Sequence, residues 1–438
     1  MVLAPAGWAG ASVYNPETFT LDNGMQVIVV TNRSAPVVSH MVWYRVGAAD
    51  EPPGKSGIAH FLEHLMYMGT EAVPDGEFSR LVARNGGQEN AFTSWDYTGY
   101  FQNVAVDRLA LVMELEADRM VNLTLTDDKV LTERDVIMEE RRQRIDDNPS
   151  ARLNEQIAAA LYQNHPYGTP IIGWPQEMAA LTRDDAIDFY RTWYAPNNAA
   201  LVVSGDIDAA ELRPLAERFY GVIPARPVPE RVRPQEPEFA TERRVILRDP
   251  EVQQTSWRRF YRAPSYASAD GDQAYALQVL SEILGGGSTG RLYRALVVDQ
   301  QLAVGAGTGY SANDLDQTSF AAFIAPVPDA DMAAVEAAYE AEITRLLRDG
   351  ATDDEVRDAK RSLVTQAVYA RDSVTGPARS LGASTATGRT VDEVESWPDR
   401  IAAVTADDVM AAARAVLDRN QSVTGLLLPD RPSAELNQ

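Results

Sequence analysis

An internal duplication constrains the fold of this chain more than any other feature. A segment crowded with prolines, 223–242, separates two stretches of similar length. Proline removes a backbone donor and disfavours helix, so this segment predicts an extended connector. On each side of it, two strand-like runs precede a helical run and a glycine turn. The pattern therefore predicts two copies of one folding unit.

The two copies align at a constant offset over their first part. MQVIVV and VVSHMVWYRVG precede the helical run SGIAHFLEHLMYMG, and RRVILRD and QQTSWRRFYRA precede AYALQVLSEILGG. Mixed short strands and helices favour an α+β chain of two homologous α/β domains. The expected organisation is a leader or signal remnant at 1–15, an N-terminal catalytic domain at 16–222, the linker at 223–242 and a homologous C-terminal domain at 243–438.

Two of the four histidines of the chain lie four residues apart, in the run HFLEH. On a helix, His60, Glu63 and His64 share one face, and Ser56 is the expected N-cap. Two imidazoles one turn apart can converge on a tetrahedral zinc ion. Glu63 beside it can accept a proton from water whose pKa the metal lowers. A catalytic zinc usually takes three protein ligands, so a third must come from elsewhere.

A second helical run, TERDVIMEERRQR, supplies a candidate for that ligand. Glu133 and Glu140 lie seven residues apart, on the face that carries Val136 and Ile137. A carboxylate on an apolar face is costly to bury unless it meets a cation or hydrogen-bond donors. We therefore predict Glu140 as the third zinc ligand and Glu133 as an acceptor that orients a ligand.

The second copy lacks every polar residue of this constellation. The equivalent positions hold Ala276, Val279, Leu280, Ala359 and Gln366. A scaffold role would be needed in both copies, so the joint loss indicates one zinc site per chain, carried by the first copy. The alternative is a solvated helix face with an ordinary polar pair, which does not explain the joint loss.

Composition narrows the classes of function. The chain has no cysteine, so a thiol nucleophile, disulfides and cysteine-based zinc fingers are excluded. Its 63 acidic and 40 basic residues give a net charge of −23, which argues against a nucleic-acid partner. No apolar run is long enough to span a bilayer.

The amino-terminal stretch MVLAPAGWAGASVYNPETF is small and apolar, with an A-x-A-like site at Ala9-Gly10-Ala11, although a basic start is missing. This favours a trimmed secretory signal and a periplasmic location. The alternatives are an unstructured leader and a cytoplasmic location.

Taken together, the motifs HFLEH, ENAFTSWDYTGYF and ERDVIMEE resemble the pitrilysin and insulinase family of inverted zinc peptidases. The closest likeness is to the branch that holds mitochondrial processing peptidase and short bacterial relatives. HPYGTPIIG and GGGSTGRL extend the resemblance over nearly the whole chain. It implies a duplicated processing-peptidase-like fold, in which each domain has a mixed, largely antiparallel sheet covered by helices. It also implies the same roles for His60, Glu63, His64, Glu133 and Glu140.

The resemblance further implies that peptides bind as an added strand along a sheet edge, here at Asn90, Ala91, Phe92 and Thr93. The alternative is that these four residues form an ordinary strand. The family pattern also places an arginine and a tyrosine in the second copy, where they bind substrate and steady the tetrahedral intermediate. Alignment puts Val297 and Val304 at those two positions.

Two explanations for the missing pair remain open. A paralogous chain could supply it, which would make this protein the zinc-bearing subunit of a heterodimer, with a homodimer as the alternative. Otherwise Tyr293, Arg294 or Tyr310 substitutes for it. We favour the heterodimer, because valine at both positions indicates a division of labour.

The function expected from the sequence is that of a zinc metalloendopeptidase acting on peptides or unfolded segments in a closed chamber. The alternatives are a non-catalytic structural subunit of a larger assembly and a specialised processing peptidase.

Overall fold

A computed structural model of the chain describes residues 13–239, 241–268, 272–371 and 373–430. The expected signal site at Ala9-Gly10-Ala11 lies outside the described residues. The end of the expected leader is part of the fold, because the backbone amides of Tyr14 and Asn15 donate to the Glu395 carboxylate at 2.9 and 3.1 Å.

The chain forms two compact units that are discontinuous in sequence. Unit 1 comprises the chain up to Ile137, Ile171–Val232 and Val364–Ala403, and unit 2 comprises Met138–Pro170, Arg233–Leu363 and the chain from Val404. The helices α4 (Asp127–Arg141) and α12 (Asp353–Ala370) each continue across a boundary. The domains expected at 16–222 and 243–438 follow the linear order, whereas each unit takes in a helical segment of the other copy.

A six-stranded sheet forms the centre of unit 1, with the order β1-β2-β6-β3-β5-β4. All neighbouring strands are antiparallel except β2 and β6, which are parallel. The strands are β1 (Glu17–Thr20), β2 (Gln26–Thr31), β3 (Val37–Tyr44), β4 (Gln88–Thr93), β5 (Thr98–Ala105) and β6 (Ala199–Gly205).

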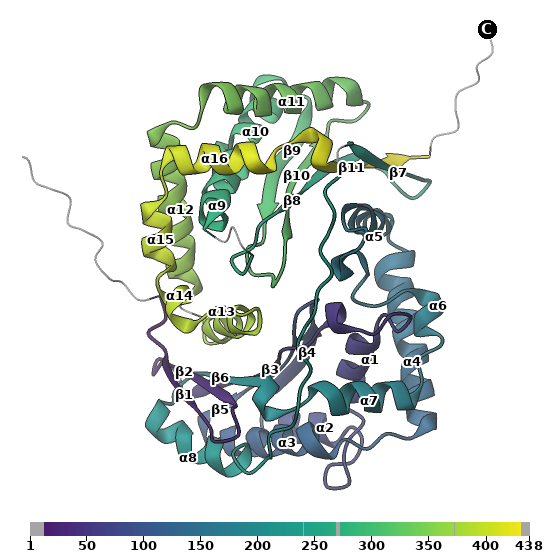
Figure 1. Ribbon diagram of the computed structural model, residues 1–438, viewed down its shortest axis with the longest axis vertical. Coiled ribbons are helices and arrows are strands. Elements are labelled where there is room, and N and C mark those ends of the chain that lie inside the picture. The colour runs from purple at the N-terminus through teal and green to yellow at the C-terminus, as the bar shows by residue number, and fades with distance from the viewer. Residues whose placement is uncertain (1–12, 240, 269–271, 372, 431–438) are drawn as a thin grey trace, which may run out of the picture. The chain divides into compact units, whose positions relative to one another are not determined.

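Helices cover both faces of this sheet (Figure 1). The helices of unit 1 other than α4 are α1 (Ile58–Leu65), α2 (Glu77–Arg84), α3 (Leu109–Asn122), α6 (Pro175–Met178), α7 (Arg183–Trp193), α8 (Ala209–Phe219), α13 (Thr375–Ala386), α14 (Val391–Glu395) and α15 (Trp397–Ala403). Helix α13 packs on β3 and β6, while α1 and α3 pack on the opposite face.

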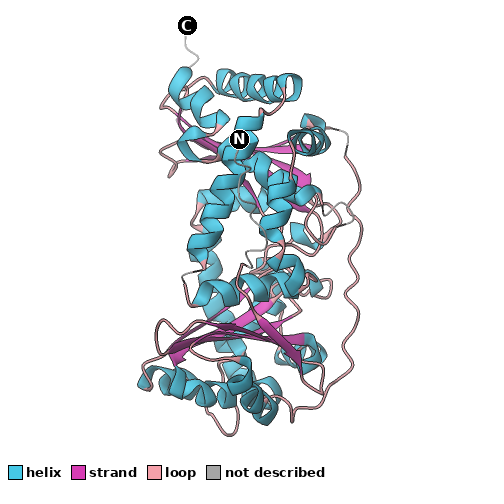
Figure 2. Ribbon diagram, turned by 90° about the vertical axis from the view of Figure 1, so that its left-hand side faces the viewer, coloured by secondary structure: helices cyan, strands magenta, loops and turns pink. Residues whose placement is uncertain are grey.

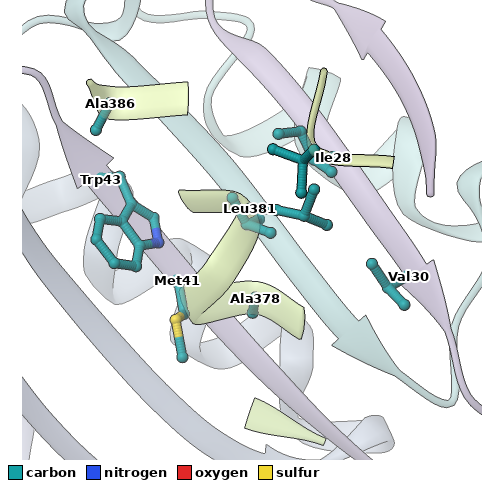
Figure 3. Packing of buried hydrophobic residues seen from close by; sticks show 9 residues of the cluster. Ile28, Val30, Met41, Trp43, Ala378, Leu381 and Ala386 are labelled. Carbon is teal, nitrogen blue, oxygen red and sulfur yellow. The ribbon is translucent and has the colours of Figure 1, made fainter. Parts of the chain in front are cut away.

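Residues of the second copy complete the core of unit 1. Leu381 and Ala378 of α13 pack against Ile28, Met41 and Trp43 of the sheet, and all five are buried (Figure 3). Alternation along a strand places Met41 and Trp43 on the same face, which is the face that α13 covers. The apolar face of the first sheet is therefore covered by a helix that follows β3 by more than 300 residues.

Unit 2 repeats the topology of unit 1. Its sheet has the order β7-β11-β8-β10-β9, and β7 and β11 form its one parallel pair among the described residues. This order matches β2-β6-β3-β5-β4 strand by strand, which confirms the predicted duplication. The strands are β7 (Arg243–Asp249), β8 (Ser256–Ala263), β9 (Ala303–Tyr310), β10 (Thr318–Pro326) and β11 (Ser422–Pro429).

The second sheet is likewise covered by a helix from the other copy. The helices of unit 2 other than α12 are α5 (Pro149–Leu161), α9 (Gln273–Gly285), α10 (Arg291–Tyr293), α11 (Met332–Asp349) and α16 (Ala406–Val416), with π-helical turns at Arg142–Asp146 and Arg294–Asp299. Leu153 and Ile157 of α5 pack against Val423 of β11. A helix of the first copy thus covers the second sheet, and Figure 2 shows helices on both sides of each group of strands.

The proline-rich segment, predicted to be an extended connector, joins α8 of unit 1 to β7 of unit 2. Its described residues, 223–239 and 241–242, contain no helix or strand. Within unit 1, Arg231 donates to the carbonyls of Asp96 and Ala386 at 2.9 and 3.1 Å. Within unit 2, the Glu236 carboxylate accepts the amides of Gln163 and Asn164, both at 2.7 Å. None of the described helices is long and apolar enough to cross a membrane.

Candidate metal centre

The helix that carries HFLEH begins at Ile58, and its N-cap residue is Gly57, with φ of +88°. The prediction that Ser56 caps this helix is wrong. The Ser56 hydroxyl instead accepts the backbone amide of Trp174 at 2.9 Å. A side chain at position 57 would meet Met178 Sδ at 2.2 Å, so glycine is required here for space as well as for its positive φ.

Glu51 provides the cap that Ser56 does not. Its carboxylate accepts the amides of Gly57 and Ala59, each at 2.9 Å. Burial raises the pKa of Glu51 well above its usual range, and the two amide bonds oppose that shift. Sequence reasoning missed this residue, because a cap seven residues before the helix leaves no local pattern.

The face predicted from the helical spacing is present on α1. The ring centroids of His60 and His64 lie 4.8 Å apart. His60 and Glu63 are buried, with 7% and 8% exposure, whereas the His64 side chain is 25% exposed. The helix packs against α7, β4 and β5, and its apolar side chains Phe61, Leu62 and Leu65 are fully buried.

Helix α4 brings the predicted carboxylates to this face. Glu133 Oε1 lies 2.7 Å from Nδ1 of His64. Ile137 is buried on the same helix, but Val136 is 48% exposed, so the expectation that Val136 lies on the apolar face is wrong. Val130, one heptad before Ile137, takes that role. The buried stripe of α4 therefore follows a spacing of seven, as Glu133 and Glu140 do.

His60, His64 and Glu140 form a candidate metal site, because each offers a ligand atom and these atoms lie within 4.8 Å of one another. Two imidazoles and one carboxylate are the donor set that suits a catalytic zinc ion. The bond to Glu133 orients the His64 ring so that a metal would meet Nε2. Glu140 also pairs with Arg144 at 2.5 Å, so a bound metal would share this carboxylate with a guanidinium. The residues present fit zinc.

Glu63 contacts the strand that was predicted to bind substrate. The Thr93 hydroxyl donates to Glu63 Oε2 at 2.5 Å. The hydroxyls of two buried tyrosines, Tyr100 and Tyr194, share a hydrogen bond of 2.9 Å. Burial raises the pKa of both tyrosines, and the charge of Glu63 raises them further. Both phenols therefore stay protonated and neutral.

The segment Asn90 to Thr93 lies in β4, which forms one edge of the sheet of unit 1. The side chain of Asn90 accepts the backbone amide of Ala91 at 2.8 Å. Phe92 faces the side of the sheet that α13 covers. Its ring centroid lies 4.9 Å from that of Trp43 and 5.0 Å from the Arg379 guanidinium. The edge strand thus directs Thr93 toward α1 and Phe92 toward α13.

A buried ion pair lies against the ring of Tyr67, which follows α1, and sequence reasoning missed it. Arg119 pairs with Glu116 at 2.5 Å, and both are at most 2% exposed. The Arg119 guanidinium lies 4.8 Å from the ring of Tyr67, one turn beyond His64, and 4.4 Å from that of Tyr100. An arginine in a helical run normally faces water, so nothing in the sequence distinguishes this one.

Unit 2 fills the positions equivalent to His60, Glu63 and His64 with core residues. Ala276, Val279 and Leu280 are buried in α9, with exposures of 3%, 0% and 0%. Val304 is 56% exposed on β9, and Val297 lies in a π-helical turn. Of the three substitutes considered for the missing pair, Tyr310 donates its hydroxyl to the carbonyl of Pro264 at 2.5 Å.

The duplicated sheet-and-helix fold, with one histidine–carboxylate cluster among the described residues, defines the class of two-domain metallopeptidase-like proteins. Residues 26–174 match the family described as "Insulinase (Peptidase family M16)", and residues 180–363 match "Peptidase M16 inactive domain". The chain belongs to the M16 peptidase family, which confirms the resemblance and the fold class predicted from sequence.

Relatives of this chain carry names that agree with this family. An uncharacterized zinc protease of Mycobacterium tuberculosis (strain ATCC 25618 / H37Rv) is 31% identical over 93% of this chain and 92% of its own. Zinc protease PqqE of Helicobacter pylori (strain ATCC 700392 / 26695) is 34% identical over 66% of this chain and 65% of its own. The crystal structure of a protease from Helicobacter pylori superposes with a TM-score of 0.86 at 29% identity, covering 95% of this chain and all of the other.

Proposed function

We propose that this protein is a zinc-dependent metalloendopeptidase that cleaves peptides or unfolded segments, with Glu63 as the general base. The observation that carries the proposal is the grouping of His60, His64 and Glu140, with Glu63 on the same helix turn. A merely solvated helix face would not bring a carboxylate from a second helix to the same point.

His60, His64 and Glu140 would hold the ion, one per chain, and Glu133 would keep His64 in the orientation that ligation needs. A bound zinc ion supplies Lewis-acid polarisation of the scissile carbonyl and lowers the pKa of water. Glu63 takes the proton of the attacking water and passes it to the departing amine. Thr93 holds Glu63 Oε2 through its hydroxyl, which limits the rotation of the carboxylate.

Substrate would bind along β4. This edge strand leads from Asn90 to Thr93, and Thr93 contacts the proposed base, so a peptide paired with the strand passes close to Glu63. Main-chain pairing holds varied sequences in extended form, while pockets on the two faces select side chains. This supports an endopeptidase of broad sequence tolerance.

Replacing Glu63 tests the mechanism. Glu63→Gln should keep zinc at one ion per chain and lower kcat for a quenched fluorescent peptide by about 10²- to 10⁴-fold. Zinc content is measured by atomic emission on the same samples. Glu139→Gln, an exposed position on α4, is the matched control and should cleave as the parent does. Turnover by Glu63→Gln at the parent rate would show that the base is another residue.

We further propose that the active enzyme is a heterodimer in which a paralogous chain supplies the missing arginine and tyrosine. The valines at positions 297 and 304 support this idea, and a homodimer is the alternative. The chain should be assayed alone and together with a co-encoded relative that carries the pair. Full chelator-sensitive activity of the chain alone would rule out the heterodimer. No activity in either sample with zinc bound would instead favour a non-catalytic subunit.

The periplasmic location also stays a proposal, supported by the small apolar start of the chain alone. Detection of the protein in periplasmic rather than cytoplasmic extracts tests it.

A further inference from the structure

Unit 1 contains a pocket of 450 Å³ that the proposed peptidase mechanism does not use. It lies where β1, β2 and the end of β3 meet the turn between α13 and α14. The side chains that matter for its chemistry are Gln26, Arg45, Arg389 and Asp392. Two of these are guanidinium groups, in a chain whose net charge is −23.

Arg45 has an unusual environment for an arginine that is largely buried. Its Nη2 donates to Oε1 of Gln26 at 3.0 Å. Within the part of the chain that the structure describes, no carboxylate forms an ion pair with it. Burial lowers the pKa of Arg45, and the nearby charge of Arg231 lowers it further. A buried cation is costly unless a counter-charge meets it.

The neighbouring arginines add to this positive charge. Arg231 bonds to two main-chain carbonyls, which accept hydrogen bonds but bring no negative charge. Arg389 donates Nη2 to the carbonyl of Glu393 at 2.9 Å. Asp392 is the one carboxylate among the residues that line the pocket, so the lining carries two positive charges and one negative, a net charge of +1.

We propose that this pocket binds a small anion with a carboxylate or phosphate group, held by Arg45 and Arg389. The planar guanidinium fork matches the two oxygens of such groups, and charge-assisted bonds of this kind are about twice as strong as neutral ones. The hydrogen bond to Gln26 holds the Arg45 guanidinium in place. The volume of the pocket exceeds that of a single phosphate ion. The inference is independent of the peptidase proposal, because none of the candidate zinc ligands lines this pocket.

Calorimetric titration of the full chain tests the proposal, with sodium phosphate and sodium succinate as the two probes. Both are titrated against a chloride buffer of equal ionic strength, so that general screening is held constant. We expect saturable binding of at least one probe at one site per chain. Arg45→Gln should weaken that binding at least tenfold, whereas Arg108→Gln, at an exposed arginine outside the pocket, should leave it unchanged.

A second variant separates binding from folding. Arg389→Lys keeps the charge but loses the planar fork, so it should weaken binding several-fold. The thermal unfolding midpoint of each variant, measured on the same samples, shows that its fold is retained. Binding of phosphate alone assigns the ligand to phosphate compounds, and binding of succinate alone assigns it to carboxylates. The proposal is overturned if neither probe binds above the chloride control, or if both pocket variants bind as the parent does.

Discussion

At the scale of single residues, carboxylates position the groups that would bind the metal. Glu133 holds His64 at Nδ1, Glu51 caps the helix that carries both histidines, and Glu140 completes the proposed ligand set. These three acids differ in whether a sequence pattern predicts their roles. Glu133 and Glu140 follow a spacing of seven on one helix, whereas Glu51 lies in a loop that offers no periodic signal.

The role of Glu133 can be measured through metal affinity. Glu133→Gln should weaken zinc binding about 10- to 100-fold, because the amide no longer accepts the imidazole proton as a charged partner. Competition with a chromogenic chelator gives the affinity directly. Glu139→Gln on the same helix should not change it, since that side chain pairs with Arg142 at the surface. An unchanged affinity in Glu133→Gln would mean that Glu133 does not orient the ligand.

At the scale of elements, the packing of α13 decides how the first sheet is buried. At Gly382, an added Cβ would lie 2.1 Å from the Trp43 ring, so the helix can approach the sheet only because this residue has no side chain. Trp43 in turn contacts Phe92 on the edge strand. The position of α13 is therefore coupled, through one indole ring, to the strand proposed to bind substrate.

Gly382→Ala tests this packing. Helix propensity alone would favour alanine by about 1 kcal/mol, so any loss must come from the clash. We expect the free energy of unfolding to fall by about 1–3 kcal/mol in urea titrations followed by tryptophan fluorescence. Gly309→Ala, where no atom lies within 4 Å of an added Cβ, controls for the general effect of the substitution. Equal stability of the two variants would show that α13 adapts to the larger residue.

At the scale of the whole molecule, the two units are interleaved along the chain. Helix α13 from the second copy covers the first sheet, and α5 from the first copy covers the second. The continuous helices α4 and α12 lead into these exchanged segments. Neither copy, cut out at the proline-rich linker, contains all the helices that bury its own sheet.

A truncated chain tests this interdependence. Residues 16–222 alone lack α13, which would expose the sheet residues Ile28, Met41 and Trp43 to water. We expect this fragment to show no sharp thermal transition and to aggregate in size-exclusion chromatography. Addition of the segment 364–403 in trans should restore part of the transition. A monomeric fragment 16–222 with a cooperative transition would contradict the interleaved arrangement.

The sequence alone determined the duplication, the family and the fold class, because these depend on periodic patterns and on motifs within short stretches. It also indicated His60, Glu63, His64, Glu133 and Glu140, since helical spacing gathers such residues on one face. Only the tertiary structure decided which helix covers which sheet, and that Glu51 rather than Ser56 caps the helix of the histidines. It also decided that Arg45 lines a pocket and forms no ion pair with a carboxylate of the described residues. The physical reason is that these features depend on contacts between segments that are distant in the chain, and such contacts leave no local pattern.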